Sequence, residues 1–182
     1  MSGDWGYRGL GRFVERHRRQ LIDTLKIPGA RVPSYSTIRR VMIQVDYQAL
    51  TQVFNQWASQ YTHHHHGQWI AIDGKSLKNT VSDCCGREQN FIMMVSAFSH
   101  HRGEILGIKV MENKNKAKSR QYKIDVVTQE DNSPQLRGQA STNISLIKSW
   151  VLSLLRVHGF DSITEALDYM SNNLPLLLSF CH

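Results

Sequence analysis

Gln68-Trp69-Ile70-Ala71-Ile72-Asp73-Gly74-Lys75 is a short apolar run, rich in β-branched and aromatic residues, that ends on an acid, a glycine and a lysine. The pattern predicts a buried strand that carries the Asp73 carboxylate at its C-terminal end, where the backbone turns. A carboxylate fixed at the end of a central strand suits a divalent cation, and the neighbouring Lys75 suits a phosphate. One acid is half of such a site, so the other half must come from elsewhere in the chain.

Two further apolar runs, at 91–98 and 104–111, predict a β-hairpin. The first run is nearly all apolar and the second alternates, so we expect a buried strand followed by a half-exposed one. His100 and His101 fall at the turn between them and are expected to face solvent. The polar interval 76–90 before the hairpin predicts a loop, and its Cys84-Cys85 pair has no evident partner for thiol chemistry.

The first sixty residues predict three amphipathic helices. The first runs from Gly11 to Lys26 with arginines on its polar face, and the second follows a cap at Ser34 or Ser36. Asp46 caps the third. These helices fit a DNA-binding module of helix-turn-helix type and a packing subdomain with solvent-facing arginines equally well.

The C-terminal third predicts a helix from Ile144 to Val157 that ends at His158-Gly159, with Trp150 in the core. Ser162 and Glu165 form a capping box for a short final helix. The run His63–His66 has the spacing of a linker and not of a metal site, since consecutive residues cannot all face one ion.

The charge of the 182-residue chain is uneven. Its net charge is +7, and residues 1–61 hold nine Lys/Arg against four Asp/Glu, whereas residues 120–182 hold five against six. This excess is a mild indication of a polyanionic partner such as DNA, although a solvated basic surface would give the same count. No run is long enough to span a bilayer, no signal peptide is evident, and three cysteines make no disulfide framework, so we expect a cytoplasmic protein.

The strand and hairpin pattern resembles the opening of the catalytic domain of the DDE transposases of bacterial insertion sequences, nearest to the ISAs-type, or H-repeat-associated, group. The segments that carry the resemblance, in the family's order, are Val32–Val41, Ile70–Lys78, Met94–Ser99, Ile105–Val110, Ile124–Asp131, Arg137–Ala140 and Ile144–Val157. The resemblance implies an α+β protein with a truncated RNase H-like fold, in which a three-stranded antiparallel sheet lies between an N-terminal helical subdomain and C-terminal helices. It implies a helical region at 1–62, a partial catalytic core at 68–121 and a C-terminal segment at 122–182.

The family's chemistry requires more acids than this chain aligns. Intact members hold a pair of Mg²⁺ ions with two aspartates and a glutamate for DNA cleavage and strand transfer. Asp73 matches the first aspartate and is the catalytic and metal-binding residue that the resemblance supplies. Residues 112–121 run almost directly into 122–125, where the family has the strand with the second aspartate and the helix with the glutamate, and Glu130-Asp131 align with a downstream acidic pair.

The resemblance therefore implies an internally deleted, N-terminally shortened transposase that is inactive as encoded and binds Mg²⁺ weakly or not at all. Loss of a neighbouring strand would leave the edge of the 69–73 strand unpaired. The implied partner is DNA at the ends of an insertion sequence, together with self-association or association with full-length transposase. The candidate DNA contacts are Arg31, Arg39, Arg40, Lys75 and Lys78.

Two other interpretations remain open at this point. A residual DNA-binding protein could recognise element ends without catalysis. A helical interaction protein of unrelated purpose would make the hairpin match accidental, and it requires that the Asp73 strand does not pair with residues 91–98.

Overall fold

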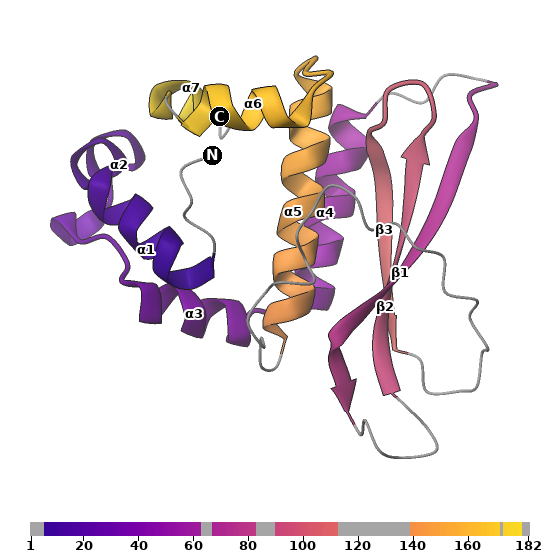
Figure 1. The fold of residues 1–182 in the computed structure, drawn as a ribbon, viewed down its shortest axis with the longest axis horizontal. Coiled ribbons are helices and arrows are strands. Elements are labelled where there is room, and N and C mark those ends of the chain that lie inside the picture. The colour runs from indigo at the N-terminus through magenta and orange to yellow at the C-terminus, as the bar shows by residue number, and fades with distance from the viewer. Residues whose placement is uncertain (1–5, 63–66, 83–89, 113–138, 172, 180–182) are drawn as a thin grey trace. The chain divides into compact units, whose positions relative to one another are not determined.

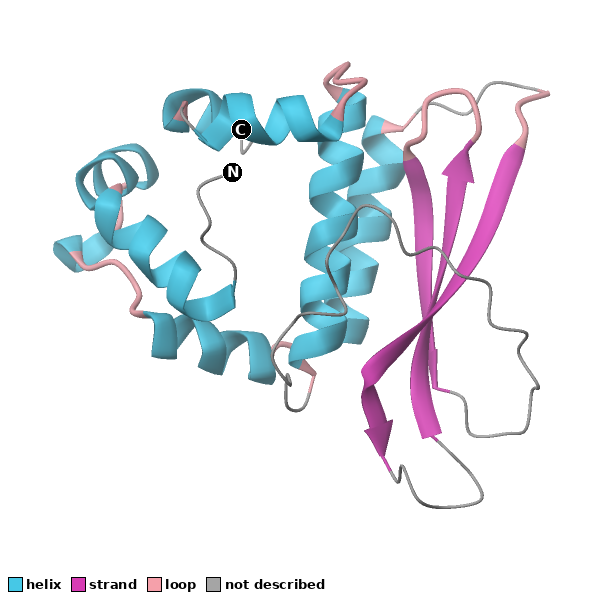
Figure 2. Ribbon diagram, in the orientation of Figure 1, coloured by secondary structure: helices cyan, strands magenta, loops and turns pink. Residues whose placement is uncertain are grey.

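A computed structural model describes residues 6–62, 67–82, 90–112, 139–171 and 173–179 of the chain, and Figures 1 and 2 show their helices and strands. The chain divides into two compact units. Residues 1–42 and 160–182 form a helical unit, and residues 43–159 form a unit that contains the sheet. None of the helices in the described ranges has the length and apolar content that crossing a membrane requires.

The helical unit contains short helices with identifiable caps. Its elements are α1 (Gly6–Arg16), α2 (Arg18–Leu25), the 3₁₀ turn η1 (Pro28–Ala30), α3 (Tyr35–Gln44, its last two residues past the unit boundary), α6 (Ile163–Ser171) and α7 (Leu174–Ser179). The Ser34 hydroxyl accepts a hydrogen bond from the Thr37 amide at 3.3 Å, which confirms the predicted cap of α3. The Ser162 hydroxyl accepts from the Glu165 amide at 3.3 Å, so α6 begins where its capping box predicted.

The prediction of one helix from Gly11 to Lys26 is wrong. His17 interrupts it with φ −100° and ψ 16°, which separates α1 from α2. The imidazole packs against the Phe13 ring with centroids 4.6 Å apart, and its Nδ1 lies 3.3 Å from the Gln20 side-chain oxygen. These local contacts favour a bent backbone that helical periodicity does not reveal.

The sheet has three antiparallel strands in the order β1-β2-β3, namely β1 (Ile70–Ser82), β2 (Asn90–Ser99) and β3 (Ile105–Glu112). The predicted hairpin and the α+β class are confirmed, whereas the RNase H-like topology remains a prediction. β1 does not end at Asp73, and residues 76–82 are strand and not loop, so both of those predictions are wrong. Pairing with β2 without a register shift from Ile70 to Leu77 carries β1 past Gly74, because backbone hydrogen bonds outweigh the polar composition.

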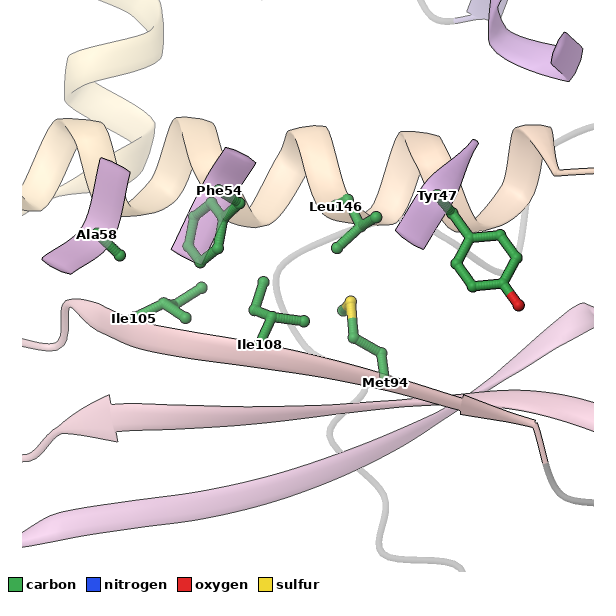
Figure 3. Close-up of a cluster of buried hydrophobic side chains, with 7 residues drawn as sticks. All are labelled: Tyr47, Phe54, Ala58, Met94, Ile105, Ile108 and Leu146. Carbon is green, nitrogen blue, oxygen red and sulfur yellow. The ribbon is translucent and has the colours of Figure 1, made fainter. Parts of the chain in front are cut away.

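Two helices, α4 (Tyr47–Tyr61) and α5 (Ala140–Val157), cover one face of this sheet (Figure 2). The Asp46 carboxylate accepts from the Gln48 amide at 3.0 Å, as its predicted role as the cap of α4 requires. Figure 3 shows the buried cluster between the helices and the sheet, which consists of Tyr47, Phe54, Ala58, Met94, Ile105, Ile108 and Leu146. Trp150 packs edge-on against Phe54 with ring centroids 5.6 Å apart, which confirms its place in the core.

The outer edge of β3 is capped by a side chain. The Asn55 amide nitrogen on α4 donates to the Ile108 carbonyl at 2.8 Å, and the Asn55 amide oxygen accepts from the Ile108 N–H at 2.8 Å. The Asn55 side chain thus takes the place of a neighbouring strand at this residue.

We predict that Asn55→Ala lowers the free energy of unfolding by about 1–3 kcal/mol, because it leaves both polar groups of Ile108 without their partner. Urea titration followed by circular dichroism measures the change. Gln52→Ala, an exposed position one turn earlier on α4, is the matched control and should change stability by less than about 0.5 kcal/mol. Equal stability of the two variants would show that the Asn55 pair contributes nothing.

Candidate functional site

Asp73 lies in the first half of β1, on the face of the sheet that α4 and α5 cover. Its register partner is Ser96 on β2, which is buried and pairs in turn with the core residue Ile108 on β3. Since antiparallel partners share a face, the half-buried Asp73 carboxylate points to the helix-covered side. Lys75 is half-buried on the same face, two residues along.

The described acids do not converge on Asp73. No group of three or more His, Cys, Asp or Glu side chains in the described ranges could hold a metal ion. Glu112 is in register with Leu77, four residues along β1 and two strands away, which corresponds to about 13 Å along the strands and about 10 Å across them. Glu130 and Asp131 lie outside the described residues. Within the described part, the residues around Asp73 therefore do not fit a pair of Mg²⁺ ions, which need shared carboxylates.

Glu104, before β3, is the most deeply buried acid of the described residues, with 1% of its surface exposed. Its Oε1 lies 3.3 Å from the Arg102 guanidinium, and the Ser99 amide donates to its carbonyl at 2.9 Å. Nothing in the sequence predicted this burial, because an acid before a strand has no distinctive pattern. The ion pair serves the hairpin turn, whose His100 and His101 are exposed as expected.

Tyr47, at the start of α4, ties together the end of β3 and the start of α5. Its hydroxyl donates to the Glu112 carboxylate at 3.1 Å, and its backbone N–H donates to the Gln139 side-chain oxygen at 3.1 Å. Burial raises the pKa of the Tyr47 hydroxyl, and the Glu112 carboxylate adds to the rise. The Asn143 amide donates to the Val45 carbonyl at 2.7 Å and closes the same corner. The end of β3 and the start of α5 therefore meet at the start of α4.

The opposite face of the sheet has a shallow hollow of about 300 Å³. It is lined by Asn55, Ile72, Val95, Ala97, Leu106, Gly107, Ile108 and Lys109. Ile72, Ala97 and Gly107 are register neighbours on the face that Asp73 does not share. The hollow is therefore separate from the candidate metal ligand, and Lys109 is its one charged lining residue.

The helical unit concentrates positive charge. Residues 6–42 contain nine Lys/Arg and two Asp/Glu, and all nine basic side chains are exposed. They are Arg8, Arg12, Arg16, Arg18, Arg19, Lys26, Arg31, Arg39 and Arg40. Three of the five predicted DNA contacts, Arg31, Arg39 and Arg40, belong to this set. Lys75 and Lys78 lie on β1 of the sheet unit, and the Lys78 side chain is outside the described set.

The helices α1 and α3 approach each other closely at Gly11. A Cβ added at Gly11 on α1 would lie 2.8 Å from the Cβ of Tyr35 on α3, so the approach requires glycine. One turn away, Tyr7 and Arg39 are near enough to interact. Burial raises the pKa of the Tyr7 hydroxyl, and the positive charge of Arg39 opposes that rise.

Comparison with known proteins identifies relatives over part of the chain. Residues 1–58 match the family model described as DDE_Tnp_1-associated. The chain is 36% identical over 76 residues to "Putative transposase YncI" of Escherichia coli O157:H7, and equally to the protein of that name in Escherichia coli strain K12. These matches cover 42% of this chain and 19% and 30% of the two relatives, so the chain spans less than a third of either. No solved structure matches the chain.

We predict that Gly11→Ala loosens the contact between α1 and α3, because the new methyl group would overlap Tyr35. The expected loss is about 1–3 kcal/mol in the stability of this contact, measured as faster hydrogen exchange of the α1 and α3 amides. Leu10→Ala on the same helix, where the leucine is 45% exposed, is the control and should leave that exchange nearly unchanged. Unchanged exchange in Gly11→Ala would mean that the helices do not need this approach.

Proposed function

We propose that this chain is a transposase-derived protein that binds DNA through its basic helical unit and, by itself, does not cleave or join DNA. The observation that carries the proposal is that residues 1–58 match a transposase-associated family and contain all nine exposed cations of the helical unit. The 36% identity to proteins named as transposases supports the same origin. Insertion-sequence ends are the DNA that such an origin implies.

The charge distribution favours a phosphate backbone as the ligand. Each cation that contacts a phosphate releases condensed counterions, so the affinity should fall steeply as salt is added. The two acids in residues 6–42, Glu15 and Asp23, neutralise little of the positive charge of this segment. Arg39 and Arg40 are adjacent and exposed on α3, whose start is held against α1 at Gly11, so they are presented from a fixed element.

We expect no cleavage because of how the described acids are arranged around Asp73. A two-metal mechanism needs carboxylates that converge on shared ions, and a single half-buried carboxylate holds Mg²⁺ weakly because this ion gives up its water reluctantly. The corner at Tyr47 is compatible with the proposed absence of the family's remaining acids from this sheet. Glu112 and Gln139 both bond to Tyr47, which holds the end of β3 beside the start of α5.

The pairing of β1 with β2 bears on the alternative of an unrelated helical interaction protein. That interpretation required the Asp73 strand not to pair with residues 91–98, yet Ile70 to Leu77 pair with residues 92–99. The remaining alternative, specific recognition of element ends without catalysis, differs from the proposal only in sequence preference.

DNA binding is tested by fluorescence anisotropy with a duplex of an insertion-sequence end and a scrambled duplex, at several salt concentrations. We expect Arg39→Gln with Arg40→Gln to weaken binding to both duplexes and to reduce the slope of log affinity against log salt by about 2. Lys109→Gln, an exposed cation of the sheet unit, is the matched control and should leave the slope unchanged. Equal slopes for all three proteins would remove Arg39 and Arg40 from the interface, and a preference for the element end that survives added salt would establish specific recognition.

Cleavage is tested separately on supercoiled plasmid with Mg²⁺ or Mn²⁺. We expect the purified chain to produce no more nicked circles than buffer, and Asp73→Asn to behave identically. Metal-dependent nicking that Asp73→Asn abolishes would contradict the proposal, because it would require acids that complete the site from outside the described residues.

A further inference from the structure

Within the described ranges, the two edges of the sheet differ in the hydrogen-bond partners of their backbone groups. At the outer edge of β3, the Asn55 side-chain amide hydrogen-bonds to the backbone N–H and C=O of Ile108, and the neighbouring Lys109 is exposed. No other strand of the described ranges pairs with the outer edge of β1. Three large apolar residues at this edge are exposed, with 82% of Trp69, 51% of Ile70 and 75% of Ile72 accessible. An exposed, unguarded apolar edge of this kind is a template for another strand.

The backbone of β1 is oriented to accept such a strand. The Trp69 carbonyl accepts from the His100 N–H at 3.0 Å, at the point where β1 and β2 begin their register. Hydrogen-bonded positions alternate along an antiparallel ladder, so the odd-numbered residues of β1 direct their polar groups to β2. The even-numbered residues, from Ile70 to Ser76, direct their N–H and C=O groups to the free edge.

We propose that a second copy of this chain occupies this edge, with β1 pairing antiparallel to β1 of the partner across a twofold axis at Gly74. The occupant is a second copy because β1 is complementary in charge to itself. With Gly74 opposite Gly74 of the partner subunit, Asp73 lies opposite Lys75 of the partner subunit, and Lys75 lies opposite Asp73 of the partner subunit. Both residues are on the same face of the sheet, where opposite cross-strand charges attract.

The resulting assembly closes at two copies. A C₂ contact uses the same surface on both subunits and leaves none of it free for a third. The two outer edges of the six-stranded sheet are then both β3 edges, each occupied at Ile108 by Asn55. This dimer uses residues of the sheet alone, and its formation does not depend on DNA binding.

The test is the mass of the full chain in solution, measured by sedimentation equilibrium over a range of concentrations. We expect a monomer–dimer equilibrium. Asp73→Lys should raise the dissociation constant by at least about tenfold, since it replaces two attractive pairs by two repulsive ones in each dimer. The exchange Asp73→Lys with Lys75→Asp restores both pairs and should return the constant to within about threefold of the original.

A second pair of variants keeps the test decisive if Asp73→Lys fails to fold by circular dichroism. Ile70→Lys at the proposed interface should also weaken the dimer, whereas Val53→Lys on α4 should not, although both native side chains are 51% exposed. A monomer at every concentration overturns the proposal. So does a dimer that Ile70→Lys leaves intact, or one that Val53→Lys weakens equally.

Discussion

The antiparallel register of β1 with β2 is the constraint on which the interpretation of this molecule depends. Ser96 is the point of reference, since it pairs with Asp73 on one side and with the core residue Ile108 on the other. Side chains alternate between faces, so a slip by one residue would move Asp73 to the uncovered face and place Ile72 under the helices. Leu77 opposes that slip, because it is a buried residue of β1, with 4% of its surface exposed, and lies on the same face as Asp73, so a slip would turn it to the uncovered face. The orientation of the Asp73 side chain therefore follows from the burial of an apolar residue on the same strand.

The core cluster and β1 are held in place by different interactions. The core cluster joins α4, α5, β2 and β3, and includes no residue of β1. β1 is held by its ladder with β2 and by its contacts with α5. A further strand beyond β1 is therefore not required to close this core. At the Tyr47 corner, hydrogen bonds to Glu112 and Gln139 hold the end of β3 beside the start of α5.

The sequence predicted the features that local chemistry controls. Caps at Ser34, Asp46 and Ser162 predicted the starts of three helices, and the apolar runs at 91–98 and 104–111 predicted the two strands of the hairpin. It failed where distant pairing decides, since β1 continues through Ser82 because β2 lies beside it. The bend at His17 and the edge role of Asn55 depend on contacts that no periodicity encodes. Asp73 was correctly placed on a strand, but its position within the strand and its face could be learned only from the register.

The nine cations of residues 6–42 and the free edge of β1 lie in different units of the chain. The cations of residues 6–42 lie in the helical unit and Asp73 lies in the sheet unit, so the attraction of these cations for a phosphate backbone does not require the Asp73 carboxylate. If two chains join at β1, each dimer contains two basic units, and we consider the case in which both contact one DNA molecule. Binding of the second unit is then intramolecular, with an effective concentration that the chain connecting the units sets. Affinity would rise with protein concentration through dimer formation even though neither basic unit gains a contact, and a variant that abolishes the dimer would lose this gain while keeping the affinity of a single unit.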